Sequence, residues 1–544
     1  MSFMQKIGTA FLLVALFILA LSCSNSKRSL FEQAGWRLNN DIHPKTQRLD
    51  LSKFSKIVYV SKINESNLQN GTKQYPFGAI KAALESLNNL SENSQAAVLV
   101  SQGIYTEETI YLIKYVHLFG GFNPKTWERD IDKYETVLTN DKEGRLIIAE
   151  NSTTIDGFII RGARYRGKGA AIYCEGTSPM ITNNFFIDDM SLKPLNWKPK
   201  YWHETANDGG AIYGKDGASP IIKNNLFIEN KTECGRGGAC AFDNQCNPKI
   251  IDNVFYRNQT GLDDPMRSSD GGAVSIFRWS KGLIEGNIFL SNSSHSNNDA
   301  GALFVALWSS PVIRNNIFVD NESGDDAGAL FVGGQEHRYD KPLDTYPPKD
   351  KFYVIIENNT FIGNRNPSMN SGAMRFTMES RGKFSKNVVA QNNGIYFQRS
   401  ETEITDNIIL DKMLVIETKE SLGKSLIKNN IIWADFVLDQ TIADVQNNNL
   451  LDADSFNGNQ KLTPEFKDDG LLLLVYSAYF VKDKNYSELI VNNNSIPNLI
   501  GRIVKSDDKW SIVKSYKDNT LQIWGNFSGV TQIQVLPTYT LNTK

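Results

Sequence analysis

A repeated block of glycine, alanine, phenylalanine and asparagine constrains the fold of this chain more than any other feature. Each block opens with Gly-Gly-Ala, or a close variant, followed by an aliphatic residue, and closes with Phe-x-x-Asn. The opening alanines are Ala171, Ala211, Ala239, Ala273, Ala302, Ala329 and Ala373. The closing phenylalanine follows sixteen residues later at Phe227, Phe255, Phe289 and Phe318. Self-similarity at a period of about 20 to 50 residues is typical of a solenoid or a repeat array.

The content of one block predicts which kind of solenoid forms. Residues 209–230 hold two short apolar runs, which are separated by Gly, Asp, Ser-Pro and Asn. No stretch of about ten residues shows the 3.6-residue periodicity of a helix. Short strands joined by tight turns, at about 27 residues per coil in the tightest copies, predict a parallel β-helix.

An asparagine column supports the same fold. Its predicted members are Asn184, Asn225, Asn253, Asn287, Asn316, Asn359, Asn387, Asn407, Asn430 and Asn449. Successive coils would place these amides about 4.8 Å apart, where they can hydrogen-bond along the stack. We therefore interpret the column as structural and not catalytic.

The N-terminus carries a targeting signal. Residues 1–22 include Lys6 and an apolar run that is too short, with these flanks, for a spanning helix. The run ends directly at Cys23, and residues 20–23 resemble a bacterial lipobox, in which the cysteine is acylated. Plain secretion, with Cys23 lost or left free, is the alternative. Residues 23–50 are polar and are expected to form a tether that lifts the body off the lipid surface.

Charge and cysteine content exclude some functions. The formal net charge is −2, and no basic run is present, so nothing indicates binding of nucleic acid. Cys240 occupies an aliphatic column of the repeat and is expected to be buried. Cys234 and Cys246 could pair across a turn, although spacing alone does not establish a disulfide. Metal binding by these cysteines is less favoured, because no C-x-x-C pair or nearby histidine accompanies them.

The passage from residue 57 to 130 predicts an N-terminal cap. Ile80, Ala83, Leu84 and Leu87 recur at helical spacing just after Pro76, and a helix there would cover the open end of the coil stack. The passage resembles the N-terminal cap of secreted right-handed parallel β-helix proteins in the pectin-lyase-like superfamily. The paired Gly-Gly-Ala and Phe-x-x-Asn signatures are similar to the repeats of the chlamydial polymorphic membrane proteins, which are surface adhesins. The resemblance implies the fold and leaves the activity open, because the superfamily contains lyases, hydrolases and adhesins.

The chain departs from these adhesins near its C-terminus. They resemble autotransporters that end in a β-barrel, whereas only about 90 residues follow the last predicted coil here. Lipid on Cys23 would replace the barrel as the anchor. Residues 457–544 contain alternating strands with Asp, Asn and Gly turns, which predict a small antiparallel β cap or domain after a β-helix at residues 51–456.

Length variation between copies indicates where function could reside. The segment from Ala to Phe is nearly constant, while the segment from Phe to the next Ala varies, and insertions on one face usually mark a binding face. The longest of these loops contains Trp197, Tyr201, Trp202 and His203, whose rings and polar groups suit a sugar. Alternatively, the loop folds down and buries its own aromatic residues.

A column of charged residues stands three positions before each alanine. Its members are Asp208, Arg236, Asp270, Asp299, Asp326 and Asn370. Asp270, Asp299 and Asp326 could bind Ca²⁺ or act as acid and base in glycoside cleavage, with Arg236 one coil away, as the resemblance to pectate lyases and polygalacturonases implies. The preferred interpretation is that each Asp accepts backbone N–H bonds in its Gly-Gly turn.

Aromatic residues recur at two further repeat positions. Tyr173, Tyr213, Phe304 and Phe331 stand two residues after the alanine and are expected to point outward, while Trp279 and Trp308 stand six residues after it. They could form a stacking platform for a glycan or a protein partner, or simply stabilise neighbouring coils. The sequence as a whole predicts an all-β, surface-anchored lipoprotein of the outer membrane or cell surface. It would be an adhesin-like, non-catalytic binder of a glycan or cell-surface partner; the alternative is a polysaccharide lyase or glycoside hydrolase acting on acidic polysaccharide, with Ca²⁺ as a possible cofactor.

Overall fold

The computed structural model describes residues 44–535 with gaps. The gaps are 64–67, 199–203, 264–268, 296–297, 335–351, 368–369, 417–422, 433, 440–442, 451–470, 483–485, 493–502, 507–508, 518 and 525. The described residues up to 450 belong to one compact unit, and those from 471 belong to a second. The predicted signal peptide, Cys23 and most of the predicted tether lie outside the described residues. No helix among the described residues is long and apolar enough to cross a membrane.

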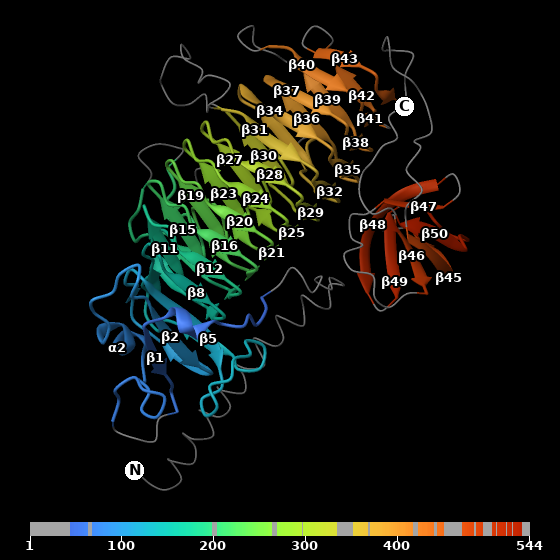
Figure 1. The fold of residues 1–544 in the computed structure, drawn as a ribbon. Helices are drawn as coiled ribbons and strands as arrows, with labels where there is room; N and C mark the ends of the chain where they lie inside the picture. The colour runs from blue at the N-terminus through green and yellow to red at the C-terminus, as the bar shows by residue number, and fades with distance from the viewer. Residues whose placement is uncertain are drawn as a thin grey trace, which may run out of the picture. The chain divides into compact units, whose positions relative to one another are not determined.

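Three long parallel sheets build the first unit, and each coil from residue 110 onward adds one strand to each sheet (Figure 1). The first strand of a coil joins the 12-stranded sheet, which contains β4 (Ile110–Tyr111), β7 (Ile147–Ile148), β11 (Ile172–Glu175), β15 (Ile212–Lys215), β19 (Cys240–Asp243), β23 (Val274–Phe277), β27 (Leu303–Ala306), β30 (Leu330–Gly333), β33 (Met374–Thr377), β36 (Ile395–Gln398), β39 (Met413–Ile416) and β42 (Phe436–Leu438).

The second strand joins the 14-stranded sheet. It contains β1 (Lys56–Val60), β2 (Ala96–Ser101), β5 (Val116–Phe122), β8 (Thr154–Asp156), β12 (Met180–Thr182), β16 (Ile221–Lys223), β20 (Lys249–Ile251), β24 (Leu283–Glu285), β28 (Val312–Arg314), β31 (Val354–Glu357), β34 (Ser380–Ser385), β37 (Ser400–Thr405), β40 (Ser425–Lys428) and β43 (Ala443–Gln446).

The third strand joins the 13-stranded sheet. It contains β3 (Gly103–Thr106), β6 (Thr136–Thr139), β9 (Ile159–Arg161), β13 (Phe185–Ile187), β17 (Leu226–Ile228), β21 (Val254–Tyr256), β25 (Ile288–Leu290), β29 (Ile317–Val319), β32 (Thr360–Ile362), β35 (Val388–Ala390), β38 (Ile408–Ile409), β41 (Ile431–Ile432) and β44 (Asn449–Leu450). Five coils add a fourth strand to a five-stranded sheet of β10 (Arg164–Arg166), β14 (Met190–Leu192), β18 (Lys231–Thr232), β22 (Gln259–Thr260) and β26 (Ser293–Ser294). The predicted parallel β-helix is confirmed.

Stacked columns of identical side chains fill the core. The phenylalanines of the repeat form one continuous stack, in which neighbouring ring centroids lie 4.6–4.9 Å apart at Phe186, Phe227, Phe255, Phe289, Phe318 and Phe361. This spacing equals the distance between neighbouring strands, so the register of the sheets sets the distance between the rings. All six rings are fully buried.

The asparagine column forms the predicted ladder at the turn between the 14-stranded and 13-stranded sheets. Each Nδ2 donates to the Oδ1 of the next coil at 2.8–3.1 Å from Asn184 to Asn448. Nine of the ten predicted members are confirmed. The last one is wrong: Asn449 opens β44 and pairs with Ile431, so its neighbour Asn448 occupies the ladder position.

A second ladder follows the first and is built from the asparagines of Phe-x-x-Asn. Its amides donate to one another at 2.8–3.0 Å through Asn230, Asn258, Asn292, Asn321, Asn364 and Asn392. An aspartate stands at each end. Asp189 accepts the N–H of Ala163 at 2.8 Å, and Asp411 accepts the amide of Asn392 at 2.7 Å.

The second glycine of each Gly-Gly-Ala motif lies where two coils approach most closely. A Cβ atom at Gly210, Gly238, Gly272, Gly301 or Gly328 would lie 2.0–2.4 Å from a backbone oxygen of the next coil. Only glycine leaves room for that contact, which explains why the motif recurs.

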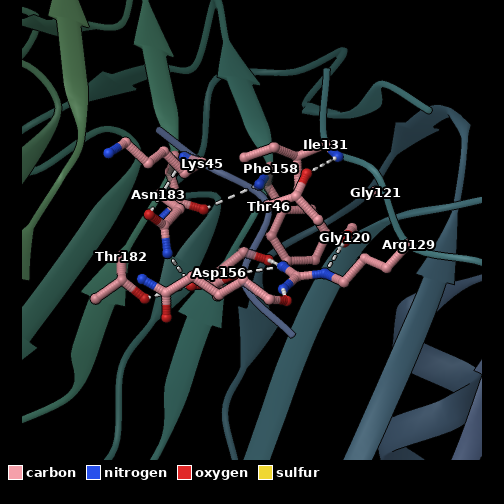
Figure 2. Close-up of polar contacts among 12 residues, drawn as sticks. Lys45, Thr46, Gly120, Gly121, Arg129, Ile131, Asp156, Phe158, Thr182 and Asn183 are labelled. Atoms are coloured by element: carbon pink, nitrogen blue, oxygen red, sulfur yellow. Dashed lines mark hydrogen bonds and ion pairs between the residues drawn. The ribbon is translucent and has the colours of Figure 1, made fainter. Parts of the chain in front are cut away.

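The N-terminal part of the chain lies against the first coils. A 3₁₀ turn, η1 (Leu51–Lys53), precedes β1, and the single described α-helix, α2 (Ile80–Glu85), lies beside β1 and β2 (Figure 1). Figure 2 shows how residues that precede β1 are held. The guanidinium of Arg129 faces the carboxylate of Asp156 in a buried ion pair, and the backbone N–H of Ile131 donates to the hydroxyl of Thr46 at 2.9 Å. Arg129 also donates to the carbonyl of Gln47 at 3.1 Å. The end of the predicted tether thus contacts the body.

The cysteines at positions 174, 234, 240 and 246 are all buried, and none of them forms a disulfide in the described part of the chain. The pairing of Cys234 with Cys246 that the sequence left open is therefore absent from the structure. Burial raises the pKa of Cys174 and of Cys246 to about 12, so both remain neutral thiols.

The second unit is a closed antiparallel barrel. Its strand order is β45 (Leu471–Val481), β46 (Tyr486–Val491), β49 (Thr520–Trp524), β48 (Lys509–Lys517), β47 (Ile503–Ser506) and β50 (Gln532–Val535). Its core contains Leu473, Leu489, Val504, Val513 and Ile523.

Candidate functional site

The charged column of the repeat lies on the loop edge, which we define as the segments that lead from each Phe-x-x-Asn motif to the next strand of the 12-stranded sheet. The register of β11 with β15 places Lys168 in the column directly before Asp208. Sequence reasoning missed Lys168, although counting three residues back from Ala171 identifies it. The column then reads Lys168, Asp208, Arg236, Asp270, Asp299 and Asp326.

The carboxylates of this column join neighbouring coils. Asp208 accepts the backbone N–H of Arg236 at 2.8 Å, and Asp270 accepts that of Asp299 at 3.0 Å. Asp299 in turn accepts the N–H of Asp326 at 3.3 Å. The expectation that these residues accept backbone N–H bonds holds for these three, but the donor belongs to the next coil and not to the residue's own Gly-Gly turn.

Ion pairs neutralise both ends of the column. Lys168 Nζ lies 2.5 Å from Asp208 Oδ2, and Arg236 Nε lies 3.5 Å from Asp270 Oδ2. Arg375 pairs with Asp326 at the other end. Burial alone would raise the pKa of Asp208, but Lys168 and Arg236 outweigh it, so that pKa is lowered.

Asp299 is the exception within the column. Burial raises its pKa well above the ordinary value, and the carboxylates of Asp326 and Asp270 add to the shift. Carboxylate oxygens of Asp299, Asp325 and Asp326 lie within 4.8 Å of one another. This group could hold a cation such as Ca²⁺, or one of its carboxyls could carry a proton as a general acid.

Trp279 and Trp308 lie at the opposite ends of β23 and β27 from the charged column. Their ring centroids are 6.3 Å apart, and Trp279 is 49% exposed. Both have left-handed backbones, with φ of 59° each, and Trp308 packs edge-on against Phe352. In an earlier coil, Asp216 and Gly217 occupy this turn, and both residue types tolerate a left-handed backbone. A left-handed backbone costs more free energy at a bulky residue such as Trp279 or Trp308.

The sequence left two roles open for Tyr213, an exposed stacking platform or the stabilisation of neighbouring coils, and the structure does not expose it. It is only 2% exposed, and its hydroxyl donates to Asp243 Oδ2 at 3.1 Å, while Arg278 pairs with the same carboxylate. Burial and the charge of Asp243 raise the pKa of Tyr213. Phe304 and Phe331 are buried as well, because they pack against each other and against alanines of the loop edge.

The long loop that begins after β14 is described only in part. Trp197 is half-buried there, and its backbone N–H donates to the carbonyl of Pro194 at 3.1 Å. The other candidates in this loop, Tyr201, Trp202 and His203, lie outside the described residues, as does the lipidation candidate Cys23.

Comparisons with known proteins address the fold of the body. The family described as right-handed β-helix region matches residues 136–337. No curated protein matches the chain. Among solved structures, pectate lyase Pel9A is 13% identical over 73% of this chain and 80% of its own, with a TM-score of 0.28.

A tailspike protein is similar over a longer stretch. A double mutant of the tailspike of E. coli bacteriophage HK620 is 10% identical over 94% of this chain and 98% of its own, with a TM-score of 0.26. A single mutant of that tailspike in complex with a pentasaccharide is 10% identical over 94% and 99%, with a TM-score of 0.25. The continuous register of the three long sheets and the matching family together identify the body of this chain as a right-handed parallel β-helix.

Proposed function

We propose that the protein is a surface-anchored lipoprotein that binds a glycan or another cell-surface partner without cleaving it. Acylated Cys23 would hold it on the outer membrane or cell surface, and the coils would present their side chains to the ligand. The ordered stack of coils provides a rigid scaffold, which lowers the entropy cost of binding an extended chain.

The Trp279 and Trp308 pair carries this proposal. Half of the Trp279 side chain is open to solvent, although burying an indole normally stabilises a fold. An exposed Trp279 beside a half-buried Trp308 on the neighbouring coil, both with left-handed backbones, supports a sugar-binding platform, in which apolar ring faces would contact the sugar and an indole N–H would donate to a hydroxyl group.

The charged column supports binding over catalysis. Asp208, Asp270 and Asp326 are each engaged by a backbone N–H, a cation or both. A carboxylate that is already paired in this way is poorly suited to act as a base.

A glycan array probed with the purified body, residues 44–544, tests the proposal. We expect the wild-type body to retain at least one class of glycan, and the Trp279→Ala, Trp308→Ala double variant to lose it. Phe352→Leu is the matched control, because it alters the packing behind Trp308 and leaves both indoles in place. Equal retention by wild type and the double variant would refute the platform.

The grouping of Asp299, Asp325 and Asp326 favours a second candidate, a polysaccharide lyase or glycoside hydrolase that uses Ca²⁺ or a shared proton. Calorimetric titration with Ca²⁺ tests it, with Asp299→Asn as the variant. Saturable binding that the variant loses would favour the enzyme, and a flat titration would favour the binder.

A further inference from the structure

Arg145 lies over the rings of two tyrosines at the first coils of the loop edge. It precedes β7 by two residues, and its guanidinium carbon lies 4.5 Å from the ring centroid of Tyr165 and 3.8 Å from that of Tyr173. Its Nε donates to the carbonyl of Lys168 at 3.1 Å. Two aromatic contacts and one hydrogen bond thus fix both the position and the plane of the guanidinium.

The outer end of this guanidinium is available for a ligand. Within the described ranges, Arg145 forms no ion pair, and neither of its Nη atoms donates a hydrogen bond. The neighbouring acids are engaged elsewhere: Glu143 pairs with Arg166 at 2.7 Å, Asp188 with Arg164 at 2.9 Å, and Glu175 with Lys215 at 2.7 Å.

The aromatic stack continues from this point along the 12-stranded sheet to the buried ring of Tyr213. Tyr173 is half-buried and stacks on Tyr213, with ring centroids 6.0 Å apart. Lys168 Nζ lies over the ring of Tyr213 at 5.2 Å, where Asp208 neutralises its charge, so Arg145 is the cation that a ligand would meet. A ligand held here would meet a cation first and an exposed ring edge beside it.

We infer that Arg145, Tyr165 and Tyr173 form a binding point for the oxyanion of an acidic sugar, either the carboxylate of a uronic acid or a sulfate ester. The two Nη groups of a fixed guanidinium match two oxygens of such a group, and the edge of the Tyr173 ring lies beside them for contact with the sugar. The inference rests on the proposed glycan binding and narrows it to anionic glycans.

Calorimetry with three polymers tests the inference on the body of residues 44–544. Polygalacturonate supplies carboxylates, dextran sulfate supplies sulfate esters, and dextran supplies neither. We expect one or both anionic polymers to bind and dextran to bind at least tenfold more weakly. Arg145→Gln should weaken anionic binding about 10-fold to 100-fold, as expected for the loss of a hydrogen bond between charged groups. Arg145→Lys should recover little, because an ammonium group lacks the planar fork.

Arg314→Gln is the matched control. It removes the same charge from an arginine whose fork is already filled by Glu285, at 2.9 and 3.1 Å. The affinity of the Arg314→Gln variant for the anionic polymer should stay within about twofold of the wild-type affinity, since a screened, distant charge contributes little. Circular dichroism melts of each variant confirm that the coils remain folded.

The outcomes separate this inference from the proposed function. If a polymer binds and Arg145→Gln binds it equally well, the inference is overturned while glycan binding stands. If no polymer binds, melting the wild type and Arg145→Gln with added galacturonate or sulfate decides. If the added anion raises the melting temperature of the wild type alone, the anion site stands and the glycan function is overturned. If it raises the melting temperature of neither protein, the anion site and the glycan function are both overturned.

Discussion

Replacing Asp189 with Asn should make the coil stack more stable, and the gain should grow with pH. In the second ladder, each asparagine accepts an N–H on Oδ1 and donates from Nδ2 both to the next amide and to a backbone carbonyl, as Asn230 does at 2.9 and 3.1 Å. Asp189 repeats the first half of this pattern by accepting the N–H of Ala163 at 2.8 Å. Its Oδ2 is buried and finds no hydrogen-bond donor in the described part of the chain.

Oδ2 of Asp189 stands where the ladder asparagines have Nδ2, which donates hydrogen bonds to acceptors. Oδ2 can hydrogen-bond to such acceptors only when it carries a proton. Complete burial raises the pKa of Asp189 well above its ordinary value, Asp188 adds to the shift, and the Ala163 N–H and Arg164 oppose it only in part. The unfolded chain has an aspartate pKa of about 3.9. Below that pH the contribution of the neutral carboxyl to stability is fully present. It falls by about 1.4 kcal/mol for each pH unit as the pH rises towards the folded pKa, because the folded state then holds the extra proton.

Urea denaturation of wild type and Asp189→Asn, followed by circular dichroism at about pH 4.5, 5.5 and 6.5, measures the effect. The variant should gain about 1.4 kcal/mol over wild type per pH unit, or about 3 kcal/mol across this range, if the folded pKa lies above it. Asp411→Asn is the control at the other end of the ladder. Burial raises the pKa of Asp411 to about 6, so its gain should level off near that pH. A difference between Asp189→Asn and wild type that does not change with pH would refute the neutral carboxyl.

Three further predictions concern the scaffold. Gly238→Ala should cost at least about 3 kcal/mol of unfolding free energy, since its Cβ would lie 2.3 Å from a carbonyl oxygen of the next coil; Gly217→Ala, with open space and a φ of +84°, should cost about 1 kcal/mol in the same urea titration. Phe255→Ala should cost about 3–5 kcal/mol by opening a cavity in the ring stack, and a melting temperature equal to wild type would contradict this. Asp156→Ala should cost about 3–5 kcal/mol because it leaves Arg129 charged and buried, whereas removing both partners should recover part of the loss in a double-mutant cycle.

The repeat made the architecture predictable because its spacing reports the coil directly. The sixteen-residue interval from Ala to Phe runs through three successive strands and the two turns between them, and the structure places both residues in buried columns, as at Ala239 and Phe255. The one wrong ladder member arose where three asparagines stand in a row. The amino-acid sequence alone does not determine which of the three asparagines enters the ladder. The pairing of Asn449 with Ile431 in the structure determines it.

The candidate site was less predictable because it depends on contacts between coils. Alternation correctly placed Tyr213 on the outer side of its strand. It could not reveal that Asp243 of the next coil accepts the Tyr213 hydroxyl and pairs with Arg278 of the coil after that. The sequence likewise gave Asp270 an acceptor role and could not say that its donor lies in the next coil. Arg145 stands outside every repeated motif, so only the geometry of Tyr165 and Tyr173 brings it to notice.

Incubation of the wild-type body with a polysaccharide that it retains tests binding without cleavage most directly. The length of the polymer is followed by size-exclusion chromatography, with Ca²⁺ present, for wild type, Asp299→Asn and the Trp279→Ala, Trp308→Ala double variant. The account predicts that the polymer keeps its length with all three proteins, while only the tryptophan variant loses retention. Polymer that shortens with wild type and stays intact with Asp299→Asn would contradict it and assign the loop edge to an enzyme.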